Sequence, residues 1–389
     1  TTYPWYDTSG KGDDGENTSG GASYSSAGGG SFTFNGTSNY VSSDDKVNLQ
    51  LGSGNFTLAA WIKPNTSLGT DYGYLAGGAA GWPSKYSTVD RIDYSNDTPT
   101  AVAKGPLSAA RYGAGGTGST SYGYIGGGHD LSSFLTTVDR IDYSNDTATA
   151  SPKGPLSLAR GGISAVGNNS YGYYGGGYTP AYRSTVDRID YSSDTSTAAA
   201  KGPLSVAKSG SAATGNTSYG WFGGGHDGSA MITIVDRIDY SNDTPTASVR
   251  GPLSSARNFL AATGNASYGY WGGGINPSGG GSSYSTVDRV DYSSDTPTAS
   301  TKGPLAVARW TYGTGNTSYG YFAGGRIGPG GANVSNVDRI DYSNDTPTAA
   351  AKGPLSLART SMGPVSSRAN ALPTSDRSNN QGIISYSDS

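Results

Sequence analysis

The stretch VDRIDYSNDTPTA, residues 89–101, recurs six times in this chain with small changes. The copies begin 48–52 residues apart, at Val89, Val138, Val186, Val235, Val287 and Val337. Two further signatures keep the same step: YGY or YGW, first at Tyr72, and GPL, first at Gly105. A fixed period of about 50 residues indicates a repeat architecture in which each unit is one supersecondary motif.

Each unit predicts four short strands. The first follows the basic residue of LSxAR, as in residues 258–263; the others are SYGYxGGG, TVDRIDY and PTAxxKGPL. Turn sequences such as TGNTS and SNDTP separate them, and the 62 glycines of the chain suit tight turns. Four strands per repeat predict an all-β fold: a six-bladed β-propeller of four-stranded antiparallel blades, with an N-terminal β extension.

The repeated letters resemble the kelch repeat over about residues 69–359. The resemblance rests on the GG after the second strand, the Tyr that ends the third strand and the Arg after the fourth. Kelch blades usually carry a Trp seven residues after that Tyr, whereas this chain has Ala each time, at Ala101, Ala150, Ala198, Ala247, Ala299 and Ala349. We therefore expect the YGY tyrosines to pack blade against blade, each stabilising the fold by about 1.5–3 kcal/mol.

We divide the chain into a flexible Gly/Ser-rich arm (1–30), a β-hairpin segment (31–68), the propeller (69–367) and a C-terminal tail (368–389). The segment SFTFNGTSNYVSS with LGSGNFTLAAWIKP resembles the opening strands of a laminin-G or concanavalin-like lectin sandwich, but it is too short to carry over a sugar site. The first repeat lacks its first strand. Residues 360–367 are the favoured source of that strand, and residues 56–63 are the alternative.

Charged residues recur at the same positions of every repeat. A carboxylate pair with an Arg clamp is one interpretation of VDRID, but catalysis needs such a group once and not six times. Middle strands are covered by neighbouring blades, so their charges need partners. We expect Arg91 and its equivalents to bridge Asp residues within or between blades. The predicted structural ion network is Asp90, Arg91, Asp93, Asp139, Arg140, Asp187, Arg188, Asp236, Arg237, Asp288, Arg289, Asp338 and Arg339.

The loops of each repeat predict one uniform face and one variable face. TGNTS and SNDTP are nearly constant, whereas the second-to-third loops differ, and the blade junctions add Tyr112, Asn258, Phe259, Trp310 and Tyr312. Loops on a rigid scaffold commonly carry binding residues; unconstrained drift is the alternative. The candidate ligand-binding face comprises Trp82, Tyr86, His129, Asp130, Phe134, Tyr178, Tyr182, Arg183, His226, Asp227, Asn276, Trp310 and Arg326.

The two histidines open equivalent loops, as His129-Asp130 and His226-Asp227. A metal site shared by these two loops is one interpretation, but the loops belong to the second and fourth blades, and adjacent blades would place the ligands better. We therefore expect the Asp residues to accept loop amides, and we expect no metal and no cofactor. We interpret the Asn-x-Ser/Thr triplets of the constant loops as turns. They begin at Asn96, Asn145, Asn242 and Asn344, and at Asn168, Asn216, Asn265 and Asn316. Glycan attachment is the alternative in a secreted eukaryotic product.

We expect no enzyme. The chain has no Cys and too few His for a kelch-type copper oxidase, and SSDTSTAA lacks the sialidase Asp box. A net charge of -3 gives no reason to expect a nucleic-acid partner, and no apolar run approaches the roughly 20 residues that span a membrane.

The lectin-like start, the near-identical repeats and the SNDT turns together resemble repeat-rich structural proteins of phage virions. That resemblance implies a tail fibre, nozzle or capsid-surface component in an oligomeric assembly, with other virion subunits and a host-surface glycan as partners. The localisation would be the virion or the extracellular space. The alternative is a secreted or cell-surface adhesin or filament subunit with a carbohydrate-binding propeller.

Overall fold

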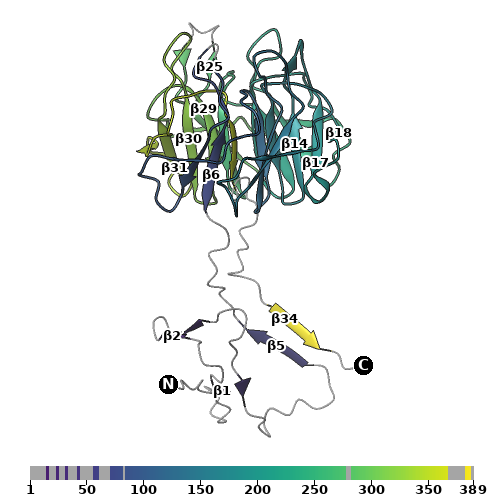
Figure 1. Cartoon of the computed structure of the whole chain (residues 1–389), viewed down its shortest axis with the longest axis vertical. Helices are drawn as coiled ribbons and strands as arrows, with labels where there is room; N and C mark the ends of the chain where they lie inside the picture. Colours follow the sequence, from purple (N-terminus) through teal and green to yellow (C-terminus); the bar gives the residue numbers. More distant parts are fainter. Residues whose placement is uncertain are drawn as a thin grey trace. The chain divides into compact units, whose positions relative to one another are not determined.

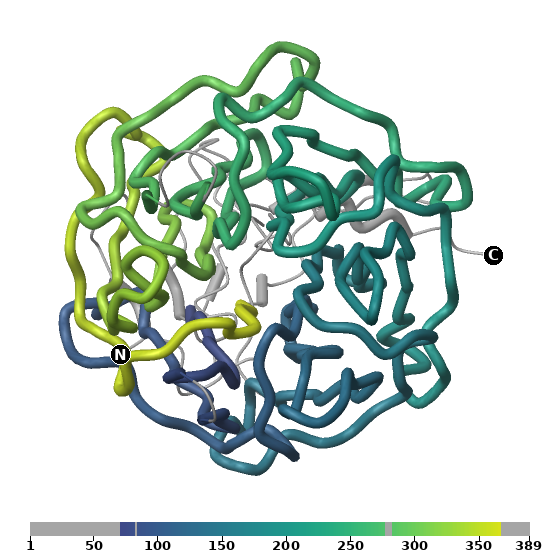
Figure 2. The backbone as a smooth tube through the Cα atoms, turned by 90° about the horizontal axis from the view of Figure 1, so that it is seen from above, coloured from purple at the N-terminus to yellow at the C-terminus, as the bar shows by residue number. Residues whose placement is uncertain are grey.

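The computed structural model describes residues 71–81, 84–276 and 282–366 in full, and elsewhere only the backbone of short strands. The chain divides into two compact units, residues 68–374 and residues 1–67 with 375–389. The larger unit is a closed ring of six four-stranded antiparallel sheets (Figures 1 and 2), which confirms the predicted all-β, six-bladed propeller. First strands of neighbouring blades contact one another around a central channel.

The blades are numbered from the one that contains β6, and their strands are given from the channel outward. Blade 1 comprises β33 (Gly363–Ser366), β6 (Tyr72–Ala76), β7 (Val89–Asp93) and β8 (Val102–Lys104). Blade 2 comprises β9 (Gly115–Gly118), β10 (Tyr122–Gly126), β11 (Val138–Asp142) and β12 (Ser151–Lys153). Blade 3 comprises β13 (Ser164–Gly167), β14 (Tyr171–Gly175), β17 (Val186–Asp190) and β18 (Ala199–Lys201).

The second half of the ring repeats this order. Blade 4 comprises β19 (Ala212–Gly215), β20 (Tyr219–Gly223), β21 (Val235–Asp239) and β22 (Ser248–Arg250). Blade 5 comprises β23 (Ala261–Gly264), β24 (Tyr268–Gly272), β27 (Val287–Asp291) and β28 (Ser300–Lys302). Blade 6 comprises β29 (Trp310–Gly315), β30 (Tyr319–Arg326), β31 (Val337–Asp341) and β32 (Ala350–Lys352).

The ring is closed by the C-terminal strand of the propeller. Strand β33 pairs with β6, with Gly363 opposite Ala76 and Ser366 opposite Gly73, so the favoured source of the missing strand is confirmed. The alternative segment does not close the ring, because β5 (Phe56–Ala60) pairs with β34 (Gly382–Tyr386) in the other unit. Blade 1 thus joins the two ends of the propeller chain.

The remaining elements are short. The hairpins β15 (Tyr178–Thr179) with β16 (Ala181–Tyr182) and β25 (Ile275–Asn276) with β26 (Ser282–Ser283) extend two second-to-third loops, and η3 (Tyr191–Ser193) follows β17. In the other unit β1 (Gly15–Glu16) pairs with β4 (Ser42–Ser43), and β2 (Ser23–Ser25) pairs with β3 (Ser31–Thr33). Most of the predicted arm, lectin-like segment and tail lies outside the described residues. No helix in the described part of the chain is long and apolar enough to cross a membrane.

Tyrosine rings pack each blade against the next. The central Tyr of YGY stacks on the Tyr that ends the third strand of the following blade, as Tyr124 does on Tyr191 with ring centroids 4.7 Å apart. In blade 4, Trp221 takes this position and stacks on Tyr292 at 4.0 Å. The prediction that the YGY residues pack blade against blade is confirmed. The other stacked pairs are Tyr74–Tyr143, Tyr173–Tyr240, Tyr270–Tyr342 and Tyr321–Tyr94.

A second tie between blades is the Asp of each SNDT or SSDT turn. Asp243 of blade 4 receives three groups of blade 3: Arg188 Nη1 at 2.7 Å, Lys201 Nζ at 3.2 Å and the Tyr173 hydroxyl at 2.9 Å. The guanidinium of Arg188 also lies 4.4 Å from the ring centroid of Tyr171. The prediction that the VDR arginines bridge Asp residues is confirmed, and the bridges run between blades. The other pairs are Arg91–Asp146, Arg140–Asp194, Arg237–Asp295, Arg289–Asp345 and Arg339–Asp97.

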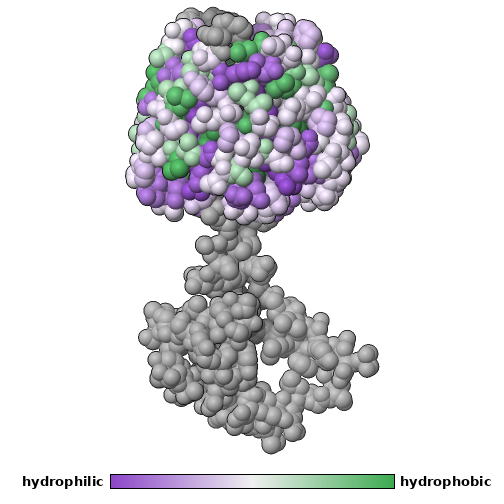
Figure 3. All heavy atoms as spheres, viewed as in Figure 1, coloured by the Kyte–Doolittle hydropathy of each residue, from purple (hydrophilic) through white to green (hydrophobic). Residues whose placement is uncertain are grey.

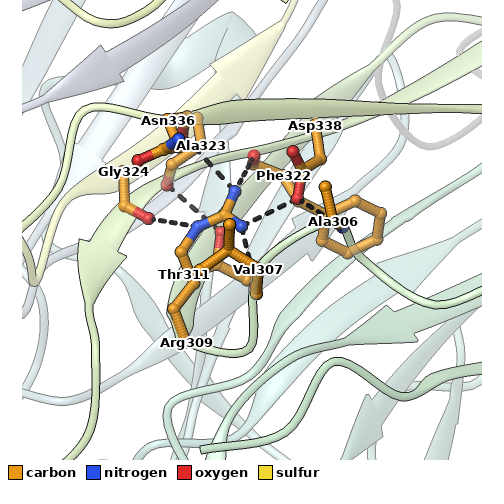
Figure 4. Close-up of polar contacts among 9 residues, drawn as sticks. All are labelled: Ala306, Val307, Arg309, Thr311, Phe322, Ala323, Gly324, Asn336 and Asp338. Carbon is orange, nitrogen blue, oxygen red and sulfur yellow. Dashed lines mark hydrogen bonds and ion pairs between the residues drawn. The ribbon is translucent and has the colours of Figure 1, made fainter. Parts of the chain in front are cut away.

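The Asp of VDR has a different partner, the basic residue of LSxAR. In blade 6, Arg309 Nη1 lies 2.8 Å from Asp338 Oδ2, and both side chains are buried (Figure 4). Arg309 also donates from Nε to the Gly324 carbonyl at 3.0 Å and from Nη2 to the Phe322 carbonyl at 2.8 Å. The network predicted from the sequence lacked these basic residues. The equivalent buried pairs are Arg111–Asp139, Arg160–Asp187, Lys208–Asp236, Arg257–Asp288 and Arg359–Asp90.

One predicted member of the network, Asp93, has another role. Its Oδ1 accepts from the backbone N of Ser95 at 2.9 Å and from the Ser95 hydroxyl at 2.6 Å. It closes the turn after the third strand and forms no ion pair with another described residue, so its inclusion in the network was wrong. Asn216 of TGNTS similarly accepts from the backbone N of Ser218 and of Tyr219, both at 2.9 Å. Turn formation therefore accounts for this residue type in the loop, as predicted.

Candidate functional site

The second-to-third loops and the blade junctions meet on one face of the ring. In blade 2 the junction residue Tyr112 pairs with His129, which opens the loop, and every other blade has the equivalent pair. Two glycines make the sharp exit from the second strand: Gly127 and Gly128 have φ of 66° and 103°, values that favour glycine. We call this end of the ring the variable face. The equivalent pairs are Gly161–Tyr178, Ser209–His226, Asn258–Ile275, Trp310–Arg326 and Thr360–Ala79.

A continuous row of aromatic rings crosses three blades on the variable face. Successive ring centroids lie 5.5, 4.7, 5.7, 5.2 and 5.3 Å apart. Three of the five contacts are edge-to-face, an arrangement that aromatic pairs prefer, and two are tilted. Five of its six members were predicted to belong to the binding face. The aromatic arc, in order from blade 2 to blade 4, is Tyr112, His129, Phe134, Tyr178, Tyr182 and His226.

The loops at the two ends of the arc have the same internal hydrogen bonds. His129 Nδ1 accepts from the backbone N of Leu131 at 2.9 Å, and His226 Nδ1 accepts from that of Gly228 at 2.9 Å. A neutral imidazole that accepts at Nδ1 carries its proton on Nε2. Asp130 Oδ1 accepts two backbone amides, at 2.7 and 2.9 Å, and these bonds lower the pKa of the carboxyl group. Asp227 does the same in its loop.

These contacts confirm that the two Asp residues bind loop amides, as predicted. Within the described ranges, no group of three or more His, Cys, Asp or Glu residues lies close enough together to hold a metal ion. The two histidines instead lie at or near opposite ends of the arc, where each holds its own loop.

A second, smaller aromatic group lies on blades 5 and 6. Phe259 stacks on Trp310 with ring centroids 4.8 Å apart, and the Arg326 guanidinium lies 5.7 Å from the Trp310 ring centroid. Arg326 also donates from Nε to the Gly331 carbonyl at 3.0 Å. Phe259 adopts a φ of 51°, where blade 4 has Gly210 at 67°. We call Phe259, Trp310 and Arg326 the Trp310 stack.

The other predicted face residues have individual positions. Tyr86 is half-buried and its backbone bonds to Gly78 and Arg111. Arg183 donates to the Thr179 carbonyl at 3.3 Å and so holds the β15–β16 hairpin. Asn276 donates from Nδ2 to the Ala256 carbonyl at 3.0 Å, and Trp82 lies outside the described residues. The structure thus brings nine of the predicted residues into the arc, its two Asp-capped end loops and the Trp310 stack. Tyr112 and Phe259, which the candidate set lacked, join them.

The central channel is a weaker candidate than the arc. It holds a cavity of about 110 Å³, lined mainly by small residues of the six first strands. At the variable face a ring of backbone bonds narrows it: Gly113 N donates to Ser361 O and Gly162 N to Gly113 O, both at 2.8 Å. Gly210, Phe259 and Thr311 continue this ring. Backbone groups that bond to one another are not available to a ligand.

Comparisons with known proteins support the fold. No protein-family model and no curated protein matches this sequence. Among solved structures, one titled "Structure of YjhT" is similar, with 14% identity, 75% of this chain and 99% of that chain covered, and a TM-score of 0.56. At that identity the likeness shows the architecture alone. The chain is a six-bladed β-propeller of four-stranded antiparallel blades.

Proposed function

We propose that this chain is a non-enzymatic structural and adhesion protein of a virion or another extracellular assembly. Its propeller presents the variable face to a host-surface glycan or protein. The observation that carries the proposal is the aromatic arc, a row of six partly exposed rings across three blades. Tyr178 remains 38% exposed, and partly exposed tyrosines combine apolar area with a polar tip, which favours recognition.

The course of the chain supports this orientation. Residues Asp71 and Ser366 mark the two ends of the described propeller chain, and both lie at the end of blade 1 opposite the variable face. The described ends of the propeller chain and the variable-face loop are thus at opposite ends of blade 1. Around the wall of the ring, hydrophobic residues form only small clusters among hydrophilic ones on the side seen in Figure 3. The side of the wall drawn there shows no broad apolar patch, which favours recognition by the loops.

The arrangement of charges favours binding over catalysis. The repeated Arg and Lys side chains of the propeller, and the Asp side chains of VDR and of the SNDT or SSDT turns, are used in ion pairs that join or stabilise the blades. Asp93 and its equivalents close turns. The two carboxylates beside the arc, Asp130 and Asp227, accept backbone amides of their own loops. A general acid or base must reach a reacting group of the substrate. The arc offers ring faces, hydroxyls and imidazole N–H groups, which suit a ligand bound without chemical change.

The proposal is tested by surface binding of the full chain. We expect labelled protein to bind host cells or an extracted host surface saturably. Phe134→Ala should weaken that binding, whereas Val249→Ala should not, because Val249 lies on outer strand β22 and is 57% exposed. Mass spectrometry of purified particles and of culture medium would separate a virion component from a secreted adhesin. Binding to no host surface and absence from every particle or filament fraction would refute the proposal.

A further inference from the structure

We infer that the aromatic arc is a binding site for an uncharged, extended oligosaccharide that lies across blades 2, 3 and 4. The inference rests on the proposed function, and it names the ligand class and the residues within the variable face. The Trp310 stack on blades 5 and 6 is outside this site.

The length of the arc favours a chain of sugars over a single sugar. From Tyr112 to His226 no ring centroid is more than 5.7 Å from the next. The apolar track is therefore continuous over three blades. A pyranose ring has an apolar face that packs on an aromatic ring, and an oligosaccharide repeats that face along its length. Each added unit can then contact a further ring of the arc.

The rings are held in place before any ligand arrives. Tyr178 and Tyr182 are directly opposite in the β15–β16 hairpin, so their side chains leave the same side of it. Gly228 of blade 4 has a φ of 100°, and a Cβ there would lie 3.0 Å from Tyr182 Cδ2. Glycine thus lets the loop of blade 4 lie against the tyrosine ring. A pre-organised set of rings loses little conformational entropy on binding, which raises affinity.

The polar atoms along the arc suit hydroxyl groups. Because Nδ1 of His129 and of His226 accepts a backbone amide, Nε2 of each carries the proton and is the available donor. The hydroxyls of Tyr178 and Tyr182 form no hydrogen bond with the described residues, and each can donate and accept. Sugar hydroxyls also donate and accept, so they can bond to both kinds of group at the edges of the rings.

The charges beside the arc favour a neutral ligand. Two cations flank it: Lys85, whose Nζ donates to the Asp130 carbonyl at 2.5 Å, and Arg183, which donates to the Thr179 carbonyl. Two carboxylates, Asp130 and Asp227, stand beside the same loops. The two positive and two negative charges sum to zero, so these four groups give no net charge to attract a sulfated or carboxylated polymer. Ring contacts and hydroxyl bonds therefore dominate, and salt has little effect on them.

The test is calorimetric titration of the full chain with neutral oligosaccharides of increasing length, a sulfated polysaccharide and a proline-rich peptide. We expect affinity for the neutral series to rise with length and to change little with salt. Tyr178→Ala and Phe134→Ala should each weaken it about tenfold or more, as truncation of an interface anchor does. Ile327→Ala is the matched control, because Ile327 is 43% exposed in the blade 6 loop outside the arc. Circular dichroism spectra and melting temperatures would show that the variants fold.

Three results would overturn the inference. The chain could bind none of the neutral oligosaccharides, or the arc variants could bind them as tightly as the parent does. The third result is tighter binding of the sulfated polysaccharide or of the peptide. These results leave the proposed function intact if the full chain still binds a host surface. If the chain binds oligosaccharides through the arc but no host surface, the ligand assignment stands and the adhesion role fails. The two proposals are therefore separable by experiment.

Discussion

Two arginines of blade 3 should differ sharply in their contribution to stability. Arg160 forms the buried pair with Asp187, with Nη1 and Oδ2 2.8 Å apart and both side chains fully buried. Arg188 forms the interblade pair with Asp243 at 2.7 Å, but its side chain is 25% exposed. We expect Arg160→Ala to destabilise the propeller more than Arg188→Ala.

The magnitudes follow from what each substitution leaves behind. Without Arg160, Asp187 keeps its two bonds from Ser157 but is a buried charge without a counterion, and removal of one member of such a pair costs about 3–5 kcal/mol. Without Arg188, Asp243 still has Lys201 and the Tyr173 hydroxyl. The loss is then one ion pair that is partly screened by solvent and a cation–π contact, together about 1–2 kcal/mol.

The assay is urea unfolding followed by circular dichroism, with the free energy of unfolding compared at unchanged slope. The chain supplies its own control, because blade 4 has Lys208 in the place of Arg160. Lys208 Nζ lies 3.0 Å from Asp236 and donates to the Phe222 carbonyl at 2.9 Å. Arg160→Lys should therefore recover most of the stability lost in Arg160→Ala. Equal losses for the two alanine variants, or no recovery with lysine, would refute the assignment of the buried pair as the stronger tie.

Three further predictions concern tyrosine and pH. The Tyr342 hydroxyl lies 2.7 Å from Thr263 Oγ1, whereas that of Tyr143 has no partner in the described structure. Tyr342→Phe should therefore lower the free energy of unfolding by about 1 kcal/mol, and Tyr143→Phe should leave it unchanged. Equal melting temperatures of the two variants would contradict this. Burial alone would raise the pKa of Asp97, but the Tyr321 hydroxyl and neighbouring cations outweigh it, so the pKa is lowered. The ionised Asp97 therefore stabilises the fold above about pH 4, and this stabilisation is lost on acidification. Asp97→Asn should flatten the acid limb of the stability curve, and an unchanged limb would count against it. Burial raises the pKa of Tyr143 and Tyr342 well above the usual value, so these protonated tyrosines stabilise the fold below about pH 10 and this stabilisation is lost as the pH rises. Tyrosinate absorbance of the buried rings that appears without loss of near-ultraviolet dichroism would contradict this.

The architecture could be predicted because the same pattern of strands and turns occurs in six copies. Alternation, turn residues and the GG pair recur at one period, so an error in one copy is corrected by the others. The role of Arg188 was also predictable, since a charge in a covered strand needs a partner. The partner of Asp187 was not, because Arg160 lies on a different segment 27 residues earlier. In the ring-closing copy, Arg359 and Asp90 are 269 residues apart, and only closure of the ring brings them together.

The candidate face could be predicted only in outline. Variation between copies showed that the second-to-third loops and the junctions share one end of the blades, but not which side chains meet there. The contact between Phe134 and Tyr178 depends on the conformations of two loops, and no sequence spacing encodes it. Tyr112 was predicted to lie at a blade junction of the variable face but was left out of the candidate set. Its contact with His129 arises from a bridge beyond the ends of β9 and β10. Asp93 was misassigned because the letters of the third strand continue into a turn.

The division between constant and variable positions has a physical cause. Tyr173 must fit a ring and a carboxylate of the next blade at once, so a change there disturbs two blades. His129 and Tyr178 contact other loops and leave those joints untouched. Even the junction of blade 6, where the register shifts between Trp310 and Tyr312, keeps the buried pair of Arg309 with Asp338. It follows that the rings of the variable face can be exchanged for others, and the ligand with them, without loss of the propeller.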